Sequence, residues 1–313
     1  LLNQEKYLKF YIISIRLTIL IAMNAVILAG GAGTRLAPLT LRMPKPLLPV
    51  ANRPILEYCI DTLLKARINR ISVTLSYKAD MIKEYCSKLG GVDFSFSVEN
   101  IPLGTAGGVK AASTDDVFVV ISGDGLTDID LSQMIQYHYE KKADVTIAVT
   151  PSCTPWLYGV VDSVDGYVRK FEEKPEVEGE RTVNTGIYVI NKSVMSHVNG
   201  VCDFSKDLFP LILKNGKIAA YEHRGYWSDV GDFRSYFKAN FDVKNGVVGD
   251  SPIIGNMLAK NATVNGFVDN CILGRGAVVA EGAVLNDCIV LPDTVVKSSH
   301  RSCIISQDTV VPV

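Results

Sequence analysis

The sequence lacks an excess of charge of either sign. Its 313 residues include 32 Lys and Arg against 33 Asp and Glu, which gives a formal net charge of -1. Proteins that collect on nucleic acid or on an anionic membrane need a net basic field. We therefore expect neither a nucleic-acid partner nor a membrane partner. An anionic substrate would have to be held by a few basic side chains positioned in its site rather than by the overall charge of the protein.

Signatures of disulfides and structural zinc are also missing. The seven cysteines form no CxxC pair, and no histidine pattern accompanies Cys271, Cys288 and Cys303. An odd number of scattered cysteines is typical of a reducing compartment. The sequence thus predicts a cytoplasmic protein whose cysteines are reduced and apolar in character.

No apolar run is long enough to cross a membrane. Residues 11–22 are apolar but interrupted by Arg16, and a membrane span needs roughly 20 apolar residues. Met23 directly precedes the first strand of the expected core. We expect residues 1–22 to be an N-terminal extension outside the native fold. A membrane-surface arm is the alternative.

Short apolar runs alternate with helical patterns from residue 24 to about residue 240. The run at residues 25–29 is apolar throughout, as expected for a strand buried on both faces. Repeated βαβ units predict a Rossmann-like, mostly parallel mixed sheet with helices on both faces, over a domain at residues 23–245. The expected strands are 25–29, 71–75, 94–98, 117–121, 145–149, 158–164, 167–171 and 183–190, and the expected helices are 54–66, 80–89, 105–112, 206–213 and 232–243.

A second domain is expected at residues 246–313, where the pattern changes. Ile272, Val278, Val284, Val290 and Val296 recur every six residues. Such hexads are typical of a parallel β-helix, in which stacked coils bury an apolar column. We expect each of these aliphatic residues to face the interior of a coil.

A glycine-rich loop follows the first strand. Residues 29–36 read Ala-Gly-Gly-Ala-Gly-Thr-Arg-Leu, and glycines allow backbone N–H groups to approach a phosphate. Neither common phosphate loop fits. A P-loop needs Gly-Lys-Ser/Thr, which Gly33-Thr34-Arg35 does not supply, and Leu36 stands in place of the third glycine of the dinucleotide fingerprint. Lys45 lies farther along the chain between Pro44 and Pro46, whose rings restrict the backbone and make the segment that carries Lys45 rigid.

The strings at residues 30–40 and 44–50 closely resemble the signature of the sugar nucleotidyltransferase family, which includes mannose-1-phosphate guanylyltransferases and glucose-1-phosphate thymidylyl- and uridylyltransferases. The resemblance covers about residues 24–240, and the C-terminal hexads resemble the left-handed β-helix of many members. It implies an enzyme that joins a nucleoside triphosphate to a sugar 1-phosphate and releases pyrophosphate. A homo-oligomer is expected, with the β-helix mediating oligomerisation or packing against the catalytic domain.

The resemblance assigns catalytic roles to Arg35 and Lys45 on the phosphates and to Asp124 and Asp229 as ligands of Mg²⁺. Asp124 ends the segment Ser-Gly-Asp after the strand 117–121, where ligand sites of open α/β sheets lie. Carboxylate oxygens suit Mg²⁺. The remaining expected nucleotide-binding residues are Leu28, Ala29, Gly30, Gly31, Gly33, Thr34, Glu99, Leu103, Gly104 and Thr105.

The sugar-phosphate site is implied by three further matches. Glu173 and Lys174 belong to a Glu-Lys-Pro segment, Asn184 to an Asn-Thr-Gly segment, and Tyr158 and Gly159 to a strand start. The resemblance implies that Glu173 and Asn184 bind sugar hydroxyls, that Lys174 binds the sugar phosphate, and that Gly159 lets the sugar approach the backbone.

The base and the sugar are harder to predict. Residues 102–108 look most like the guanylyltransferase branch, and Glu99 would accept hydrogen bonds from guanine, so GTP and mannose 1-phosphate are favoured. Glucose 1-phosphate with UTP or dTTP and heptose-type substrates remain open. A non-catalytic paralogue would be expected to lose one of the four catalytic residues, all of which are present. An acyltransferase would need a histidine in the coils, where only His300 occurs.

Overall fold

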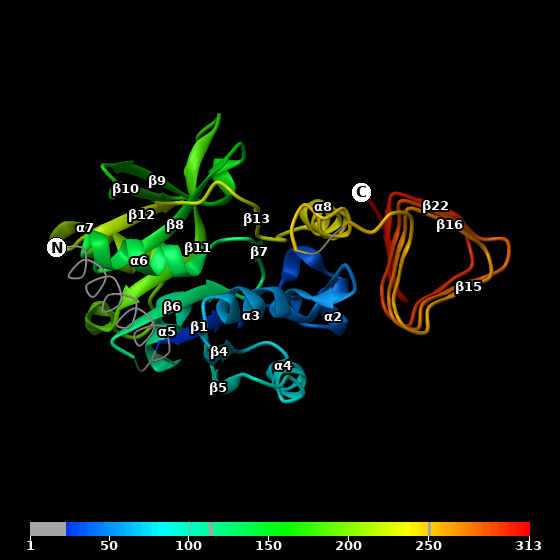
Figure 1. Cartoon of the computed structure of the whole chain (residues 1–313), viewed down its shortest axis with the longest axis horizontal. Coiled ribbons are helices and arrows are strands. Elements are labelled where there is room, and N and C mark those ends of the chain that lie inside the picture. Colours follow the sequence, from blue (N-terminus) through cyan, green and yellow to red (C-terminus); the bar gives the residue numbers. More distant parts are fainter. Residues whose placement is uncertain (1–22, 100, 113–114, 250–251) are drawn as a thin grey trace, which may run out of the picture.

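The structure is a computed structural model that describes residues 23–99, 101–112, 115–249 and 252–313. The expectation for residues 1–22 lies outside the described residues. Figure 1 shows an α/β body joined to a coiled stack of short strands at the C-terminal end. Within the described part of the chain, no helix has the length and apolar character of a membrane span.

A nine-stranded mixed sheet forms the centre of the α/β body, in the order β5-β4-β1-β6-β11-β8-β12-β10-β9. The pairs β4–β5, β1–β4, β1–β6 and β8–β12 are parallel, whereas β10 and β11 run against their neighbours. This confirms the predicted mostly parallel mixed sheet. The bounds are β1 (Asn24–Leu28), β4 (Arg70–Leu75), β5 (Asp93–Val98), β6 (Val117–Ser122), β8 (Val145–Ser152), β9 (Gly159–Val164), β10 (Tyr167–Glu173), β11 (Arg181–Asn191) and β12 (Ile218–Glu222).

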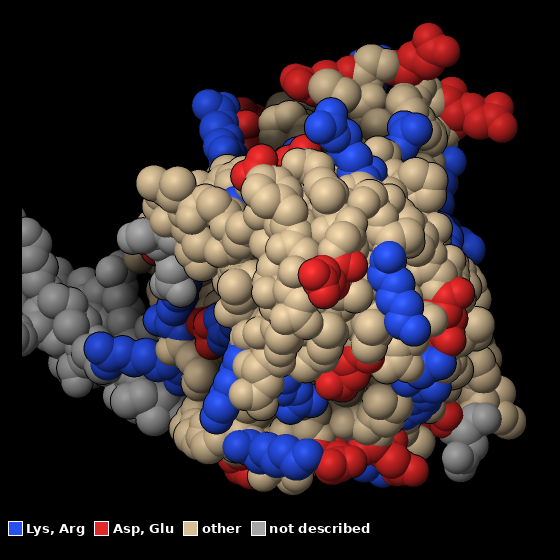
Figure 2. Space-filling model, turned by 90° about the vertical axis from the view of Figure 1, so that its right-hand side faces the viewer, with Lys and Arg blue, Asp and Glu red and all other residues tan. Residues whose placement is uncertain are grey.

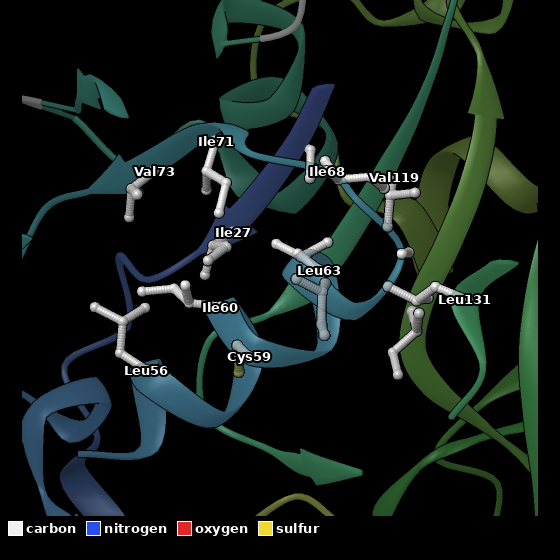
Figure 3. Close-up of a cluster of buried hydrophobic side chains, with 14 of the residues drawn as sticks. Ile27, Leu56, Cys59, Ile60, Leu63, Ile68, Ile71, Val73, Val119 and Leu131 are labelled. Carbon is white, nitrogen blue, oxygen red and sulfur yellow. The ribbon is translucent and has the colours of Figure 1, made fainter. Parts of the chain in front are cut away.

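Helices cover both faces of the sheet because β1 is apolar on both sides. Ile27 packs in one buried cluster with Leu63 of α3 (Ile55–Lys65) and with Val119, as Figure 3 shows. Val26, the preceding residue of β1, points to the opposite face and packs in a second cluster with Val109 of α5 (Gly104–Ala112). Two further helices, α4 (Ala79–Cys86) and α6 (Leu131–Lys141), contribute to the first cluster, and α7 (Phe209–Asn215) contributes to the second.

Short elements at the carboxyl end of the sheet bring distant segments together. The segment after β1 forms η1 (Thr34–Leu36), α2 (Leu39–Arg42) and η2 (Lys45–Leu47), followed by the hairpin β2 (Pro49–Val50) and β3 (Arg53–Pro54). After β6, β7 (Leu126–Thr127) pairs with β13 (Trp227–Ser228). The remaining elements are η3 (Pro155–Leu157), η4 (Lys192–His197), the π-helical turn η5 (Phe204–Leu208) and α8 (Phe233–Lys244).

Three columns of parallel strands form the C-terminal β-helix: β14-β17-β20-β23, β15-β18-β21 and β16-β19-β22. A final strand, β24, folds back antiparallel on β23. The bounds are β14 (Met257–Leu258), β15 (Thr263–Val264), β16 (Phe267–Asp269), β17 (Ile272–Leu273), β18 (Val278–Val279), β19 (Val284–Asn286), β20 (Ile289–Val290), β21 (Val295–Val296), β22 (His300–Arg301), β23 (Cys303–Ile305) and β24 (Val310–Pro312).

The expected interior register of the hexads is only partly right. Val290 and Val296 lie in the interior cluster of the coils as predicted. Ile272, by contrast, faces the catalytic domain, Val278 is half-buried outside the interior cluster, and Val284 is exposed. Their following neighbours, such as Leu273, fill the interior instead. A strand alternates faces at every residue, so a shift of one position exchanges inside for outside.

The β-helix packs against the catalytic domain, which is one of the two roles expected for it. Ile272, Ile289 and Ile304 share a buried cluster with Tyr236 of α8 and Val50 of β2. Figure 2, which views the molecule from the β-helix side, shows a broad area without charged side chains. Oligomerisation and the boundary at residues 245 and 246 stay predictions.

A buried histidine predicts how stability depends on pH. His138 of α6 is bonded to Thr146 at 2.8 Å and to Asn191 at 3.0 Å, and burial lowers its pKa below the ordinary value of 6.5. The unfolded chain then binds the proton first, so stability is complete above about pH 6.5 and falls below it, by up to about 1.4 kcal/mol per pH unit. Urea unfolding from pH 7.5 to 5 should show this slope, and His138→Gln should reduce it; an unchanged slope contradicts the assignment.

Candidate active site

The glycine loop lines a cavity of about 210 Å³ at the end of β1. Gly33 has a φ of 63°, and a Cβ placed there would lie 2.9 Å from Cγ2 of Thr40. Both its backbone conformation and this close approach require glycine. The lining residues are Leu28, Ala29, Gly31, Gly33, Thr34, Arg35, Lys45, Pro46, Asp124 and Gly231.

A second cavity, of about 220 Å³, adjoins the first, because Arg35 and Asp124 line both. Its walls come from the ends of β6, β9, β10 and β13 and from the middle of β11, and they include every residue predicted for the sugar phosphate. The predicted residues among its lining are Tyr158, Gly159, Glu173, Lys174, Asn184 and Asp229.

The short β7–β13 pair brings Asp124 and Asp229 together from distant parts of the chain. Leu126 pairs with Ser228, one residue before Asp229. A Cβ at Gly125 would lie 3.1 Å from the Ser228 carbonyl oxygen and 3.8 Å from Cα of Asp229. Glycine at position 125 therefore allows the two segments to approach closely.

Lys45 lies between the two acidic segments. Its side chain is buried, and Nζ donates to Oδ2 of Asp124 at 2.7 Å and to the backbone carbonyl of Asp229 at 3.0 Å. Burial raises the pKa of the Asp229 carboxyl, and the like charge of Asp124 adds to this, whereas Lys45 and Arg35 act in the opposite direction. Two anionic groups thus share a half-buried site with two cations.

The donor set fits a magnesium ion. Within the described ranges, no group of three or more His, Cys, Asp and Glu side chains could hold a metal by itself. Mg²⁺ does not need such a group, because it keeps several waters and is commonly bound by one or two carboxylates together with substrate phosphates. Asp124 and Asp229 could supply those carboxylates, and the repulsion between them favours a cation there.

On the sugar side, backbone contacts fix the predicted residues. Gly159 pairs with Glu173 across β9 and β10, and the Lys174 N–H donates to the Tyr158 carbonyl at 2.9 Å. Oδ1 of Asn184 accepts from the Gly186 N–H at 2.9 Å. These residues of β9, β10 and β11 and their neighbours therefore line the second cavity together.

Five predicted nucleotide residues line neither cavity: Gly30, Glu99, Leu103, Gly104 and Thr105. Glu99 accepts a hydrogen bond from the Leu103 N–H at 3.0 Å, and Thr105 bonds Asp203 at 2.9 Å. Gly104 packs against the backbone of Cys202. In this structure these contacts order the start of α5, and the role of the five residues in binding the nucleotide stays a prediction.

Several lining residues were not predicted for the site, among them Thr127, Leu157, Tyr188, Ser205 and Trp227. Tyr188 accepts from Nδ2 of Asn184 at 2.9 Å, and Trp227 donates to the Thr185 carbonyl at 3.1 Å. Trp227 also contacts the ring of Tyr158 edge-on at 5.0 Å. Trp227 directly precedes Ser228 and Asp229, and Leu157 directly precedes Tyr158, so these two residues could have been indicated by their predicted neighbours.

Comparison with known proteins places this geometry in a family. A family model described as nucleotidyl transferase matches residues 24–246. Mannose-1-phosphate guanylyltransferase catalytic subunit beta of Xenopus tropicalis is 35% identical over 226 residues, which are 68% of this chain and 62% of that protein. Probable mannose-1-phosphate guanylyltransferase 2 of Oryza sativa subsp. japonica is 32% identical over 309 residues, 90% of this chain and 84% of that protein.

Two solved structures with similar folds support the same family. HddC from Yersinia pseudotuberculosis complexed with GMP-PN has a TM-score of 0.61 and 31% identity, covering 71% of this chain and 100% of that one. A putative glucose-1-phosphate thymidylyltransferase from Bacillus anthracis, in complex with a sucrose, has a TM-score of 0.66 and 26% identity, covering 73% of this chain and 98% of that one. The chain therefore belongs to the nucleotidyl transferase family and is a sugar-1-phosphate nucleotidyltransferase.

Proposed function

We propose that the protein transfers a guanylyl group from GTP to mannose 1-phosphate, with Mg²⁺ as cofactor, in the cytoplasm. The observation that carries the proposal is the pair of adjoining cavities that share Arg35 and Asp124. One cavity has the glycine loop expected for a nucleotide, and the other has the polar strand ends expected for a sugar phosphate. The two substrates would meet where the shared residues lie.

In the proposed reaction, a phosphate oxygen of the sugar 1-phosphate attacks the α-phosphorus of the triphosphate. The new P–O bond forms in line with the breaking bond, and pyrophosphate leaves with that electron pair. Both reactants are anions, so positioning and charge neutralisation supply most of the catalysis. Arg35 and Lys45 neutralise phosphate charge, and Mg²⁺, when held by Asp124 and Asp229, would add to that neutralisation.

The guanine and mannose preferences are supported by the names of the relatives. The Xenopus and Oryza proteins are mannose-1-phosphate guanylyltransferases, and HddC was solved with GMP-PN. The Bacillus structure keeps glucose 1-phosphate with dTTP or UTP as the second candidate. A regulatory paralogue without catalysis is disfavoured by Arg35, Lys45, Asp124 and Asp229, which line the shared site.

Pyrophosphate release tests the proposal directly. Purified protein with Mg²⁺ is offered GTP, ATP, CTP, UTP and dTTP, each with mannose 1-phosphate, glucose 1-phosphate or a heptose 1-phosphate. We expect one strong combination, GTP with mannose 1-phosphate, and its loss with EDTA. A strong signal for another combination would replace the substrates but keep the reaction. Silence across all combinations, with calorimetry showing that a nucleotide sugar binds, would support the regulatory paralogue.

A further inference from the structure

The rear of the nucleotide loop rests on the β-helix. Leu36, which ends η1 and follows Arg35 in the loop, is fully buried. Leu39 of α2 is also buried, with only 4% of its surface exposed. Both lie in the cluster that contains Ile289 and Ile304 of the β-helix. The loop that faces the first cavity is therefore supported from behind by the C-terminal domain.

A polar contact joins the same two parts at the end of α2. The guanidinium of Arg42 donates from Nη2 to Oδ1 of Asp308 at 2.6 Å and from Nε to the other carboxylate oxygen. Nη1 donates to Oε1 of Gln307 at 2.5 Å. A bidentate pair of this kind fixes direction as well as distance. Arg42 is thus oriented by two residues of the turn between β23 and β24.

That turn is held firmly within the β-helix. Within the turn, the Ser306 N–H donates to the Thr309 carbonyl at 2.8 Å. Nε2 of Gln307 donates to the Asp293 carbonyl of the preceding coil at 2.8 Å, which leaves Oε1 free to accept from Arg42. The turn is therefore a fixed support for the end of α2.

Helix α2 in turn holds the nucleotide loop. Thr40 is buried, and its hydroxyl donates to the carbonyl of Gly33 at 3.0 Å, at the left-handed residue of the loop. On the other side, Tyr77 donates to the Thr40 carbonyl at 3.1 Å. Any displacement of α2 would consequently be passed to Gly33 and to the backbone N–H groups beside it.

We propose that Gln307 and Asp308 are positioning residues for the nucleotide, which act through Arg42 and α2 on the loop around Gly33. The inference rests on the proposed function, because it assigns the nucleoside triphosphate to the first cavity. None of the three polar residues lines either cavity. Their loss should weaken binding of the triphosphate and leave binding of the sugar phosphate unchanged.

The experiment uses Asp308→Asn, which removes the charge and keeps the size of the side chain. We expect the KM and the calorimetric Kd for GTP to rise by about three- to tenfold, which lies within the range of coupling seen for residues that act through a packed network. The KM for mannose 1-phosphate should stay as in the wild type. Glu84→Gln is the matched control, because it removes a similarly exposed ion pair, between Glu84 on α4 and Lys88 just after that helix, away from the loop.

A charge exchange completes the test. Arg42→Asp should raise the Kd for GTP, and combining it with Asp308→Arg should restore most of the affinity. Equal rises for GTP and the sugar phosphate, or no rise in Asp308→Asn, would overturn the inference. A wild-type protein that neither binds GTP nor releases pyrophosphate would instead overturn the proposed function. Thermal unfolding of each variant identifies any that fails to fold.

Discussion

Asp124→Asn is expected to lower kcat by about a hundredfold to a thousandfold, because one of two carboxylates for the metal becomes neutral. Asp124 lines both cavities and accepts from Lys45 at 2.7 Å, so its charge lies at the junction of the two substrates. The amide keeps the size of the side chain and one oxygen ligand. Raising the Mg²⁺ concentration should therefore recover part of the lost rate. Steady-state kinetics over a series of Mg²⁺ concentrations measures both effects.

Asp130→Asn is the matched control for this variant. Asp130 is nearby in sequence, but it caps α6 by accepting from the Gln133 N–H at 3.1 Å and lines neither cavity. Asparagine caps a helix about as well as aspartate, so the control should keep wild-type activity. If Asp124→Asn also keeps it at limiting Mg²⁺, the carboxylate is not a metal ligand.

The fold was largely predictable where one local pattern decided the structure. Strand β1 is apolar from Ala25 to Leu28 because both of its faces are covered. Since it directly precedes the glycine loop, it also indicated at which edge of the sheet the site lies. Helix α8 (Phe233–Lys244) was also predicted, at residues 232–243, and its start is fixed locally: the Asp232 carboxylate accepts from the Ser235 N–H, and the Asp232 N–H donates to the Ser235 hydroxyl oxygen in return. Such features depend on residues close in sequence.

Other features depended on partners distant in sequence. Helix α6 lay outside the predicted elements, although Leu131, Met134, Ile135 and His138 are buried along one face; the polar His138 weakens that apolar pattern. The shift in register at Ile272 has the same origin. Its outward face is apolar because the catalytic domain covers it, which the repeat pattern alone does not show.

The site divides in the same way. The residues predicted to be catalytic and those predicted to bind the sugar phosphate stand in strings that resemble a family signature, and the structure brings them together. Tyr188 and Ser205 belong to no such string and reach the cavity through the packing of β11 and η5. The contact of Arg42 with Asp308 joins residues 266 positions apart, and neither residue belongs to a predicted motif.

Lys45→Met is the second change with a large expected effect. Met is similar in length but carries no charge, and Lys45 is 7% exposed, so the variant should fold. Both acidic segments would lose the cation that now bonds Asp124 and the carbonyl of Asp229. The reacting phosphate would lose it too. We expect kcat to fall by about a hundredfold or more.

Metal binding distinguishes Lys45→Met from Asp124→Asn. Without Lys45 the repulsion between Asp124 and Asp229 is less neutralised, so the site should bind Mn²⁺ in calorimetry as well as the wild type does, or more tightly. Asp124→Asn should bind it more weakly. Lys88→Met, at an exposed position just after α4, is the control and should change neither rate nor metal affinity. Weaker Mn²⁺ binding in Lys45→Met would mean that Lys45 holds the carboxylates in place for the ion, and near-normal turnover would exclude it from the reacting phosphate.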